Sequence, residues 1–226
     1  MLVRYAFNIQ EIEIDDMFHE LETLISEERY KKMQRYHFEI DKIRSLFAEI
    51  LLRYGLKKNF SIEGAQIQFE TNEYGKPHLK ENSHIHFNVS HSGDWVICAI
   101  SSKPVGVDVE QMKERNIDIA ERFYAEEEYE SLLACENVSE LFFKYWTLKE
   151  SYVKAEGKGM SISFNSFAFH IGDEITLTVE KEICTKYQFQ VYKIAEDFEV
   201  ATCSMEPIEG KFQIISLTDI KEMLLS

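Results

Sequence analysis

The chain has 226 residues, and its 25 Lys and Arg residues against 40 Asp and Glu residues give a net charge of −15 at pH 7 with seven neutral histidines. Apolar residues make up 45% of the chain and aromatic residues 13%, which excludes disordered and collagen-like proteins and predicts a hydrophobic core. The acidic balance argues against binding to nucleic acid or to an anionic membrane. The first residues lack the basic start and apolar run of a signal peptide, and no run of about 18 apolar residues predicts a membrane span. Four widely spaced cysteines without a C-x-x-C motif indicate free thiols, so a cytoplasmic protein is expected.

The first expected elements are helices. One helix is predicted to start at Asp15, and Ser26 followed by two glutamates is typical of the N-cap of a second helix. Apolar residues between Ile40 and Tyr54 recur at steps of three and four, which predicts a third helix. Gly55 is expected to end this helix in a left-handed conformation.

Strand patterns follow the third helix. Apolar residues alternate with polar ones over residues 65–69 and 85–89, which predicts two half-buried strands separated by turn residues from Asn72 to Pro77. The apolar run from Trp95 to Ile100 predicts a strand buried on both faces. Residues 105–110 alternate again and predict another strand.

The second half of the chain repeats the order of helices before strands. Helical patterns over residues 117–155 are closed by Gly157 and Gly159. The chain then alternates in FAFHI, ITLTV, YQFQVY, FEVATC and FQIIS before a short helix near Thr218–Leu225.

This doubled order, with a seam near Lys103 to Val105, predicts the domain organisation. No Pro/Ser-rich linker divides the chain, so the halves are expected to pack together. We predict an α+β fold of two packed halves, residues 1–103 and 104–226, with the functional site in the cleft between them.

The sharpest local motif is Gly106-Val-Asp-Val-Glu110. In a strand, the side chains of Asp108 and Glu110 point to one face, while the valines point to the core. Oxygen ligands without neighbouring Cys or His suit Mg²⁺. Gly106 is expected to leave the same face open for a closely approaching ligand. The alternative is an ordinary exposed strand face.

A second motif, Trp146-Thr-Leu-Lys-Glu-Ser-Tyr-Val-Lys154, lies within a predicted helix. Trp146, Glu150 and Lys154 follow one another at four-residue steps, so they share one face, and Lys149 lies beside it. A carboxylate that completes a metal site beside lysines that hold phosphate suits phosphoryl transfer. The alternative is a Glu-to-Lys surface pair.

A third motif, Asn88-Val-Ser-His-Ser-Gly93, closes a predicted strand. Ser90, His91 and backbone N–H groups at the turn make a plausible phosphate cradle. A Ser-His nucleophile pair is disfavoured, because neighbours on a strand point apart. Basic residues stand out against the acidic background and form either a solvated face or a phosphate-binding wall: Arg29, Lys31, Lys32, Arg35, Lys42, Arg44, Arg53 and Lys76.

Taken together, these segments resemble the Sfp-type 4′-phosphopantetheinyl transferases, which activate nonribosomal peptide and polyketide synthetases in antibiotic biosynthesis. The carboxylate motif and the helix motif occur in the expected order, with 42 positions from Asp108 to Glu150. Further matches are Glu-Tyr-Gly-Lys-Pro77, Phe-Asn-Val-Ser-His-Ser-Gly93 and Gly157-Lys-Gly159. The resemblance runs from about Ile25 to Gly159 and more faintly to the C-terminus.

The resemblance implies a pseudo-dimer of two similar α+β halves with coenzyme A and Mg²⁺ in the cleft between them. Asp108, Glu110 and Glu150 would hold Mg²⁺ on the coenzyme A pyrophosphate, with Lys154 and Lys149 near its oxygens.

The resemblance also implies contacts to the nucleotide. Ser90 and His91 would face the 3′-phosphate, and Lys76 would approach the adenine or phosphate end. Arg44, Arg29 and Lys32 would line the nucleotide side. The family often has a lysine where this chain has Arg29, so the chain departs from the family pattern at that position.

The implied reaction is attack by a serine hydroxyl of an apo peptidyl, aryl or acyl carrier protein on the phosphate that bears the pantetheine arm, with release of adenosine 3′,5′-bisphosphate. Glu150 or Glu128 would deprotonate the serine, and Lys154 is the candidate acid for the departing phosphate. Two alternatives remain: another Mg²⁺-dependent phosphotransferase, and an inactive module that binds the carrier protein or coenzyme A.

The expected partners are coenzyme A and acidic carrier proteins. Because the chain itself is acidic, docking is expected to be local and apolar, around Phe123, Tyr124 and the Met112 segment. Two halves within one chain would complete the cleft, so a monomer is expected.

Overall fold

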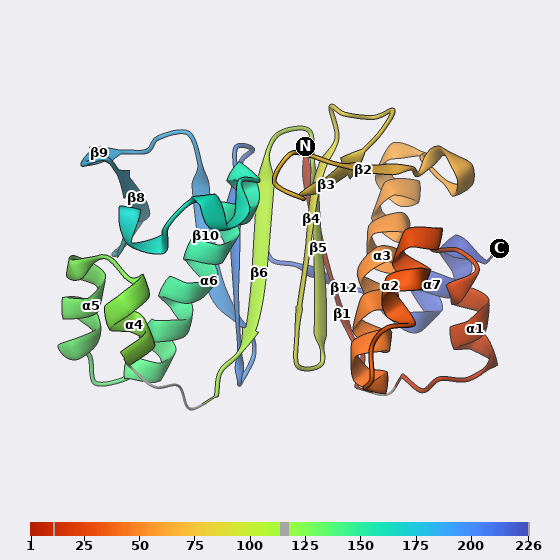
Figure 1. The fold of residues 1–226 in the computed structure, drawn as a ribbon, viewed down its shortest axis with the longest axis horizontal. Helices are drawn as coiled ribbons and strands as arrows, with labels where there is room; N and C mark the ends of the chain where they lie inside the picture. The colour runs from red at the N-terminus through yellow and green to blue at the C-terminus, as the bar shows by residue number, and fades with distance from the viewer. Residues whose placement is uncertain (11, 114–117, 226) are drawn as a thin grey trace.

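The computed structural model describes residues 1–10, 12–113 and 118–225, and it arranges them in four layers (Figure 1). Two β-sheets lie in the middle, and helices cover the outer face of each sheet. The α+β fold of two packed halves is therefore confirmed. None of the helices in the described residues is long and apolar enough to cross a membrane.

The N-terminal half contains β1 (Leu2–Asn8), α1 (Asp16–Glu22), α2 (Glu27–Met33), α3 (Glu39–Phe60), the 3-10 turn η1 (Gly64–Gln66), β2 (Phe69–Thr71), β3 (Pro77–Leu79), β4 (His86–Ser92) and β5 (Trp95–Ser101). Both predicted helix starts are confirmed: Asp15 caps α1 by accepting from the Phe18 N–H, and the Ser26 hydroxyl caps α2 by accepting from the Arg29 N–H. Strand β5 is buried along its whole length, as its apolar run predicts.

The C-terminal half contains β6 (Val105–Gln111), α4 (Asp118–Phe123), α5 (Glu126–Leu133), α6 (Val138–Glu156), the 3-10 turns η2 (Gly159–Ser161) and η3 (Phe164–Ser166), β7 (Phe167–Ile171), β8 (Ile175–Val179), β9 (Glu182–Ile183), β10 (Gln188–Ala195), β11 (Phe198–Ser204), β12 (Gln213–Ile214) and α7 (Leu217–Leu224). Residue 117, where the helical region was predicted to begin, lies outside the described residues.

The two halves share one topology. Each half has a first strand, a long helix and then an antiparallel hairpin whose second strand pairs with the first strand, giving the orders β1-β5-β4 and β6-β11-β10. Helix α3 packs on the first sheet and α6 on the second. The doubled order of elements in the sequence therefore reflects a doubled supersecondary unit.

A core of apolar side chains lies between the two sheets. Its buried members include Ile97 and Ala99 of β5, Val107 and Val109 of β6 and Val200 of β11. Full burial of a valine or isoleucine stabilises the fold by about 1.5–3 kcal/mol relative to an exposed side chain. This core makes the two halves one packed unit and fixes the cleft at their edge.

Strands β4 and β6 lie side by side at the seam between the halves and run in the same direction. Their contacts are made by side chains of β4: the Asn88 side-chain oxygen accepts from the Val107 N–H at 2.9 Å, and the Ser92 hydroxyl accepts from the Gln111 N–H at 3.1 Å. Side chains of β4 therefore take the place of some backbone-to-backbone hydrogen bonds between these two strands. Serine hydroxyl groups of β4 face the second half as a result.

The last segment of the chain returns to the N-terminal half. Strand β12 pairs in parallel with β1, and α7 packs on α3 (Figure 1). Ile220 of α7 is fully buried in the N-terminal core. Each half of the sequence therefore contributes to the first sheet layer.

One strand was missed, and two predictions about the elements are wrong. Strand β1 was not predicted, although its buried residues form an inner strand of the first sheet. Gly55 does not end α3: the helix continues to Phe60, and a Cβ at Gly55 would lie 2.5 Å from the Ile100 side chain, so the glycine serves close packing of helix on sheet. Residues 64–66 form a 3-10 turn in place of the strand predicted over 65–69, since only Phe69 enters β2.

Candidate active site

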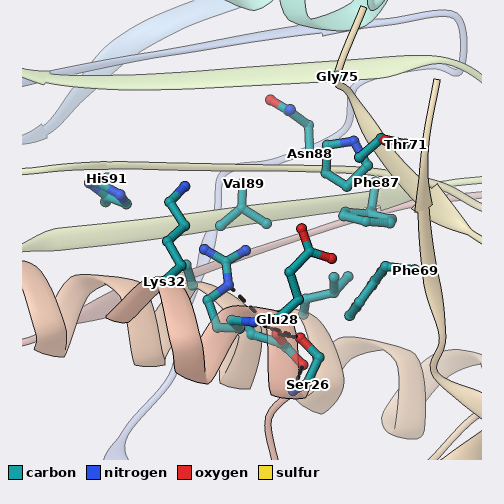
Figure 2. A pocket seen from close by; sticks show the side chains of 15 residues that line it. Ser26, Glu28, Lys32, Phe69, Thr71, Gly75, Phe87, Asn88, Val89 and His91 are labelled. Carbon is teal, nitrogen blue, oxygen red and sulfur yellow. Dashed lines mark hydrogen bonds and ion pairs between the residues drawn. The ribbon is translucent and has the colours of Figure 1, made fainter. Parts of the chain in front are cut away.

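Two adjoining cavities form a cleft that runs from the N-terminal half into the seam. The first, of about 340 Å³, lies between α2, α3, the β2–β3 hairpin and β4 (Figure 2). The second, of about 310 Å³, lies between the turn before β3 and the C-terminal end of α6. Gly75, Pro77 and Asn88 line both cavities, so the two adjoin each other.

Asp108 lies on the face of β6 that is turned toward α6, because the alternating valines occupy the other face. The side chain is buried, and its Oδ1 accepts from the Ser90 hydroxyl at 2.9 Å and from the Lys154 ammonium at 2.5 Å. Its Oδ2 is buried without a hydrogen-bond partner among the described residues. Burial raises the pKa of Asp108, against the lowering effect of Lys154. One oxygen of this carboxylate is therefore held, and the other is available to a ligand.

Glu110 lies two residues further along the same face and is half-buried. It accepts from the Ser92 hydroxyl at 3.0 Å, so Ser90 and Ser92 of β4 hold the two carboxylates of β6 in matching two-residue steps. The prediction that Asp108 and Glu110 share a face is confirmed.

Helix α6 brings Glu150 and Lys154 to the second cavity, one helical turn apart. Burial raises the pKa of Glu150; Lys154 opposes this shift, and Asp108 and Glu110 add to it. Burial alone lowers the pKa of Lys154, but the attraction of Asp108 and Glu150 outweighs it, and the net shift is upward. The structure thus brings together three carboxylates and one ammonium that sense one another's charge.

The donor set fits a hard divalent cation. The carboxylates of Asp108, Glu110 and Glu150 act on one another, the Ser90 hydroxyl bonds Asp108, and Oδ2 of Asp108 is buried without a hydrogen-bond partner among the described residues; Mg²⁺ prefers such oxygen ligands. Within the described ranges, no three His, Cys, Asp or Glu side chains are gathered closely enough to form a preformed metal centre. The Lys154 ammonium provides the positive charge beside Asp108.

The prediction that Gly106 leaves its strand face open for a ligand is wrong. A Cβ at Gly106 would lie 2.0 Å from the Ser151 carbonyl oxygen and 2.5 Å from the Ala155 nitrogen. The face above Gly106 is therefore covered by the backbone of α6 and is not open to a ligand. The glycine lets α6 approach β6, and this close approach places Lys154 on Asp108.

Cationic side chains of α2 form a wall of the first cavity. Arg29 and Lys32 both line it, and Figure 2 shows Lys32 rising from the helix toward the strand that carries His91. The buried Glu49 of α3 lies behind this wall: its carboxylate accepts from the Ser26 N–H at 2.7 Å and lies 3.6 Å from the Arg29 guanidinium. Its bonds to Arg53, at 2.6 and 2.8 Å, complete a buried network that fixes the start of α2.

His91 lines the same cavity, and its ring keeps a solvent-exposed face. Partial burial, which disfavours the charged imidazolium, lowers the pKa of His91 to about 4, and the positive charges of Arg44 and Lys154 add to this shift. The Arg44 guanidinium is held close by, with Nε donating to the Gly93 carbonyl at 2.8 Å and Nη1 to Asp41 at 2.9 Å. His91 is therefore neutral near pH 7, with the cationic side chains of Arg44 and Lys154 close enough to act on it.

Two residues predicted to contact the nucleotide make hydrogen bonds within the protein. The Ser90 hydroxyl donates to Asp108, so Ser90 belongs to the carboxylate cluster. The Lys76 ammonium donates to three carbonyl oxygens, those of Val105, Lys154 and Ala155, and thus uses all three of its protons within the protein.

Glu128 and Lys149 lie outside the site. Both side chains are fully buried in the C-terminal half, 2.7 Å apart, and Lys149 also donates to the carbonyls of Phe164 and Phe167. Burial raises the pKa of Glu128 and lowers that of Lys149 to about 8. The predicted roles of Glu128 as a base and of Lys149 as a phosphate contact are therefore wrong, because neither side chain reaches the cleft.

The residues expected to dock a partner fall into two environments. Phe123 is 40% exposed, whereas Tyr124 is 3% exposed and donates its hydroxyl proton to the Phe142 carbonyl. Met112 is partly buried against the same core. Of the three, Phe123 alone presents a large exposed apolar side chain.

Glu49 was missed by the analysis of the sequence, whereas Asn88 and Ser92 lay within the third motif but were not predicted to bond β6. A signal for Asn88 and Ser92 is present, because residues 88, 90 and 92 share one strand face and match the spacing of Asp108 and Glu110. Glu49 had no such signal, since a buried acid within an apolar helix pattern is identified only by its distant partners.

Comparisons with known proteins show which family the chain resembles over its length. The family profile described as 4′-phosphopantetheinyl transferase superfamily matches residues 104–203, and the profile described as 4′-phosphopantetheinyl transferase, N-terminal, matches residues 13–103. The 4′-phosphopantetheinyl transferase gsp of Aneurinibacillus migulanus is 42% identical over 201 residues, which cover 85% of this chain and 82% of gsp. The 4′-phosphopantetheinyl transferase Sfp of Bacillus subtilis (strain 168) is 34% identical over 188 residues, which cover 82% of this chain and 84% of Sfp.

A solved structure, the holo-[acyl-carrier-protein] synthase of Thermotoga maritima, overlaps 44% of this chain and 61% of its own, with 26% identity and a TM-score of 0.39. This overlap is too partial to bear on the site. The two curated relatives, by contrast, each match more than four fifths of this chain. The resemblance seen in the motifs is confirmed, and the chain belongs to the 4′-phosphopantetheinyl transferase superfamily.

Proposed function

We propose that this protein moves the 4′-phosphopantetheine arm of coenzyme A to a serine of apo carrier proteins, with Mg²⁺ as its cofactor. The observation that carries the proposal is the cluster of Asp108, Glu150 and Lys154 beside a cavity lined by Arg29 and Lys32. Such a juxtaposition supplies carboxylates for a cation and cations for a nucleotide's phosphates within one cleft.

The reaction forms one bond and breaks one. The serine oxygen of the carrier attacks the phosphorus that bears the pantetheine arm, and the bond from this phosphorus to the bridging oxygen of the pyrophosphate breaks. The serine proton passes to a base on the enzyme, and adenosine 3′,5′-bisphosphate leaves with the bridging oxygen. Because the nucleophile arrives on the partner, the enzyme needs to position and neutralise charge more than to attack.

Glu150 is the base in this proposal. It lines the second cavity, makes no hydrogen bond or ion pair within the described residues, and has a raised pKa, which makes it a stronger base than an ordinary surface glutamate. Lys154, anchored on Asp108, is the donor for the oxygen of the leaving group.

Asp108, Glu110 and Glu150 would hold Mg²⁺, and the unpartnered Oδ2 of Asp108 supports this assignment. When bound, the ion neutralises charge on the pyrophosphate and polarises its phosphorus–oxygen bonds. Glu150 has two carboxylate oxygens, so one is available to the ion and the other to the serine proton.

Arg29, Lys32, Arg44 and His91 would hold the nucleotide in the first cavity. Support comes from Arg29, Lys32 and His91, which line that cavity, and from Arg44, whose positive charge acts on His91. Four free cysteines agree with a reducing compartment, so we place the reaction in the cytoplasm. One chain contains both walls of the cleft, which supports a monomer.

The test is the intact mass of an apo peptidyl carrier domain after incubation with this protein, coenzyme A and Mg²⁺. We expect a gain of one phosphopantetheinyl group that EDTA prevents and that a carrier with Ser→Ala at its acceptor does not show. Asp108→Ala should abolish transfer with the fold intact, and a fully active Mg²⁺-dependent Asp108→Ala enzyme contradicts the metal assignment. Coenzyme A binding without any transfer to several apo carriers would instead indicate an inactive binding module, and binding of ATP in its place another phosphotransferase.

A further inference from the structure

The turn from Asn72 to Pro77, between β2 and β3, reaches from the N-terminal half to the end of α6. Its shape is fixed internally, because the Asn72 side-chain oxygen accepts from the N–H groups of Tyr74 and Lys76 at 3.0 and 2.8 Å. The amide nitrogen of the same Asn72 side chain donates to the Gly157 carbonyl at 2.8 Å. One asparagine thus shapes the turn and attaches it to the second half.

Lys76 makes the second attachment. Its ammonium donates to the carbonyls of Lys154 at 2.5 Å, Val105 at 3.3 Å and Ala155 at 3.4 Å. Two of these carbonyls belong to the last turn of α6, where carbonyl oxygens lack partners within the helix and carry partial negative charge. The Lys76 ammonium therefore caps the C-terminal end of α6. One of the carbonyls that it binds is that of Lys154, and the side chain of Lys154 in turn binds Asp108.

Gly157 leaves room for this attachment. It ends α6 with a φ of 70°, and a Cβ there would lie 2.9 Å from Cδ of Lys76 and 3.5 Å from the Asn72 amide nitrogen. A glycine at this position thus serves both the left-handed end of the helix and the approach of the turn.

The same turn forms the wall between the two cavities. Gly75 and Pro77 line both cavities, and Tyr74 and Lys76 line the second. A wall of the nucleotide cavity is therefore bonded directly to the end of α6, one helical turn from Glu150.

We propose that Asn72 and Lys76 are positioning residues that align the nucleotide cavity with the reacting side chains of α6. This inference rests on the proposed transferase function. The turn acts as a clasp, because it holds the Lys154 backbone in place and so keeps the Lys154 ammonium on Asp108. The turn takes no direct part in binding the phosphates of coenzyme A.

The test compares Asn72→Ala, Lys76→Met and the double variant with a matched control, Lys80→Met, which removes an exposed lysine from the same hairpin. For the clasp we expect kcat for transfer to an apo carrier to fall about 10- to 100-fold in each single variant, as for a slight misplacement of reacting groups. The Kd for adenosine 3′,5′-bisphosphate should change less than about threefold. The double variant should be little worse than either single one, because both residues hold the same turn against the end of α6. Lys80→Met should match the wild type.

A different pattern overturns the inference. If Lys76 holds a phosphate, Lys76→Met raises the Kd for adenosine 3′,5′-bisphosphate at least about tenfold, since a charged contact is lost, and Asn72→Ala is silent. Hydrogen exchange of the amides at the end of α6 gives a readout that needs no activity: both single variants should speed it, and unchanged exchange in Asn72→Ala contradicts the clasp even if Lys76→Met fails to fold. If wild-type protein transfers nothing, the transferase proposal fails, whereas the exchange data still decide whether the clasp exists.

Discussion

The buried pair of Glu128 and Lys149 allows a sharp test of which carboxylates are structural. Glu128→Gln should destabilise the fold by about 3–5 kcal/mol, because it leaves the Lys149 ammonium uncompensated in the core. Two unit charges 2.7 Å apart attract by roughly 6 kcal/mol at an effective dielectric constant of about 20, and part of this offsets the cost of removing both from water. Glu128 also accepts from the N–H groups of Ala125 at 2.9 Å and Phe169 at 2.7 Å, so one residue ties α5, α6 and β7 together.

The assay for this prediction is urea denaturation of Glu128→Gln, with kcat for carrier modification measured per folded molecule. Glu130→Gln is the matched control, since Glu130 lies on the same helix and is exposed, and it should change stability by less than about 0.5 kcal/mol. We expect a large loss of stability and an unchanged kcat at a temperature where the variant is folded. A variant of wild-type stability with a kcat reduced a thousandfold would refute the reasoning and restore Glu128 as a candidate base.

Three further predictions follow from burial, packing and charge. The pKa of His91 is near 4 when folded and near 6.5 when unfolded, so the unfolded chain binds the proton first as the pH falls. The stability of the fold should therefore drop between pH 6.5 and 4, and the drop should be shallower in His91→Gln. Thermal melts across that pH range measure this. An equally steep drop in the variant argues against His91 as the source of the pH dependence. Gly106→Ala should cost about 3 kcal/mol or more in urea denaturation, because its Cβ meets the Ser151 carbonyl of α6; a stable variant means that α6 can move away from β6. Ile220→Ala should cost about 2–5 kcal/mol, because α7 is part of the N-terminal core, and a loss below 1 kcal/mol would indicate that the C-terminal segment is dispensable.

Local patterns in the sequence predicted the elements that depend on neighbours along the chain. The caps at Asp15 and Ser26, the alternation of β6 and the end of α6 at Gly157 each follow from side chains a few residues apart. Gly55 shows where such reasoning fails: a glycine after an apolar helix pattern indicates a C-cap, but here a strand residue, Ile100, packs against it. The contact that decides the role of this glycine comes from a residue 45 positions away in the sequence.

The candidate site divides in the same way. The helix period places Glu150 and Lys154 on one face, and the structure confirms this. Lys149 precedes Glu150 by one residue and therefore points elsewhere, toward the apolar face that contains Phe142 and Tyr145. The partner of Lys149, Glu128, lies on another helix. The spacing of residues within the motif therefore does not show whether Lys149 binds a ligand or is buried in an ion pair.

The cleft depends on contacts that cross between the two halves at Asp108, Glu110 and Lys154. Asp108 of the second half is held by Ser90 of the first, Glu110 by Ser92, and the Lys154 backbone by Lys76. Neither half alone therefore holds these side chains in place, although each has its own sheet and helix. The polar seam between β4 and β6 explains how this is achieved: where a continuous sheet would use backbone bonds, serine side chains bond the carboxylates instead. The same hydroxyl groups that join the halves thus orient the carboxylates toward the cleft, so an arrangement suited to joining two repeats also builds the site between them.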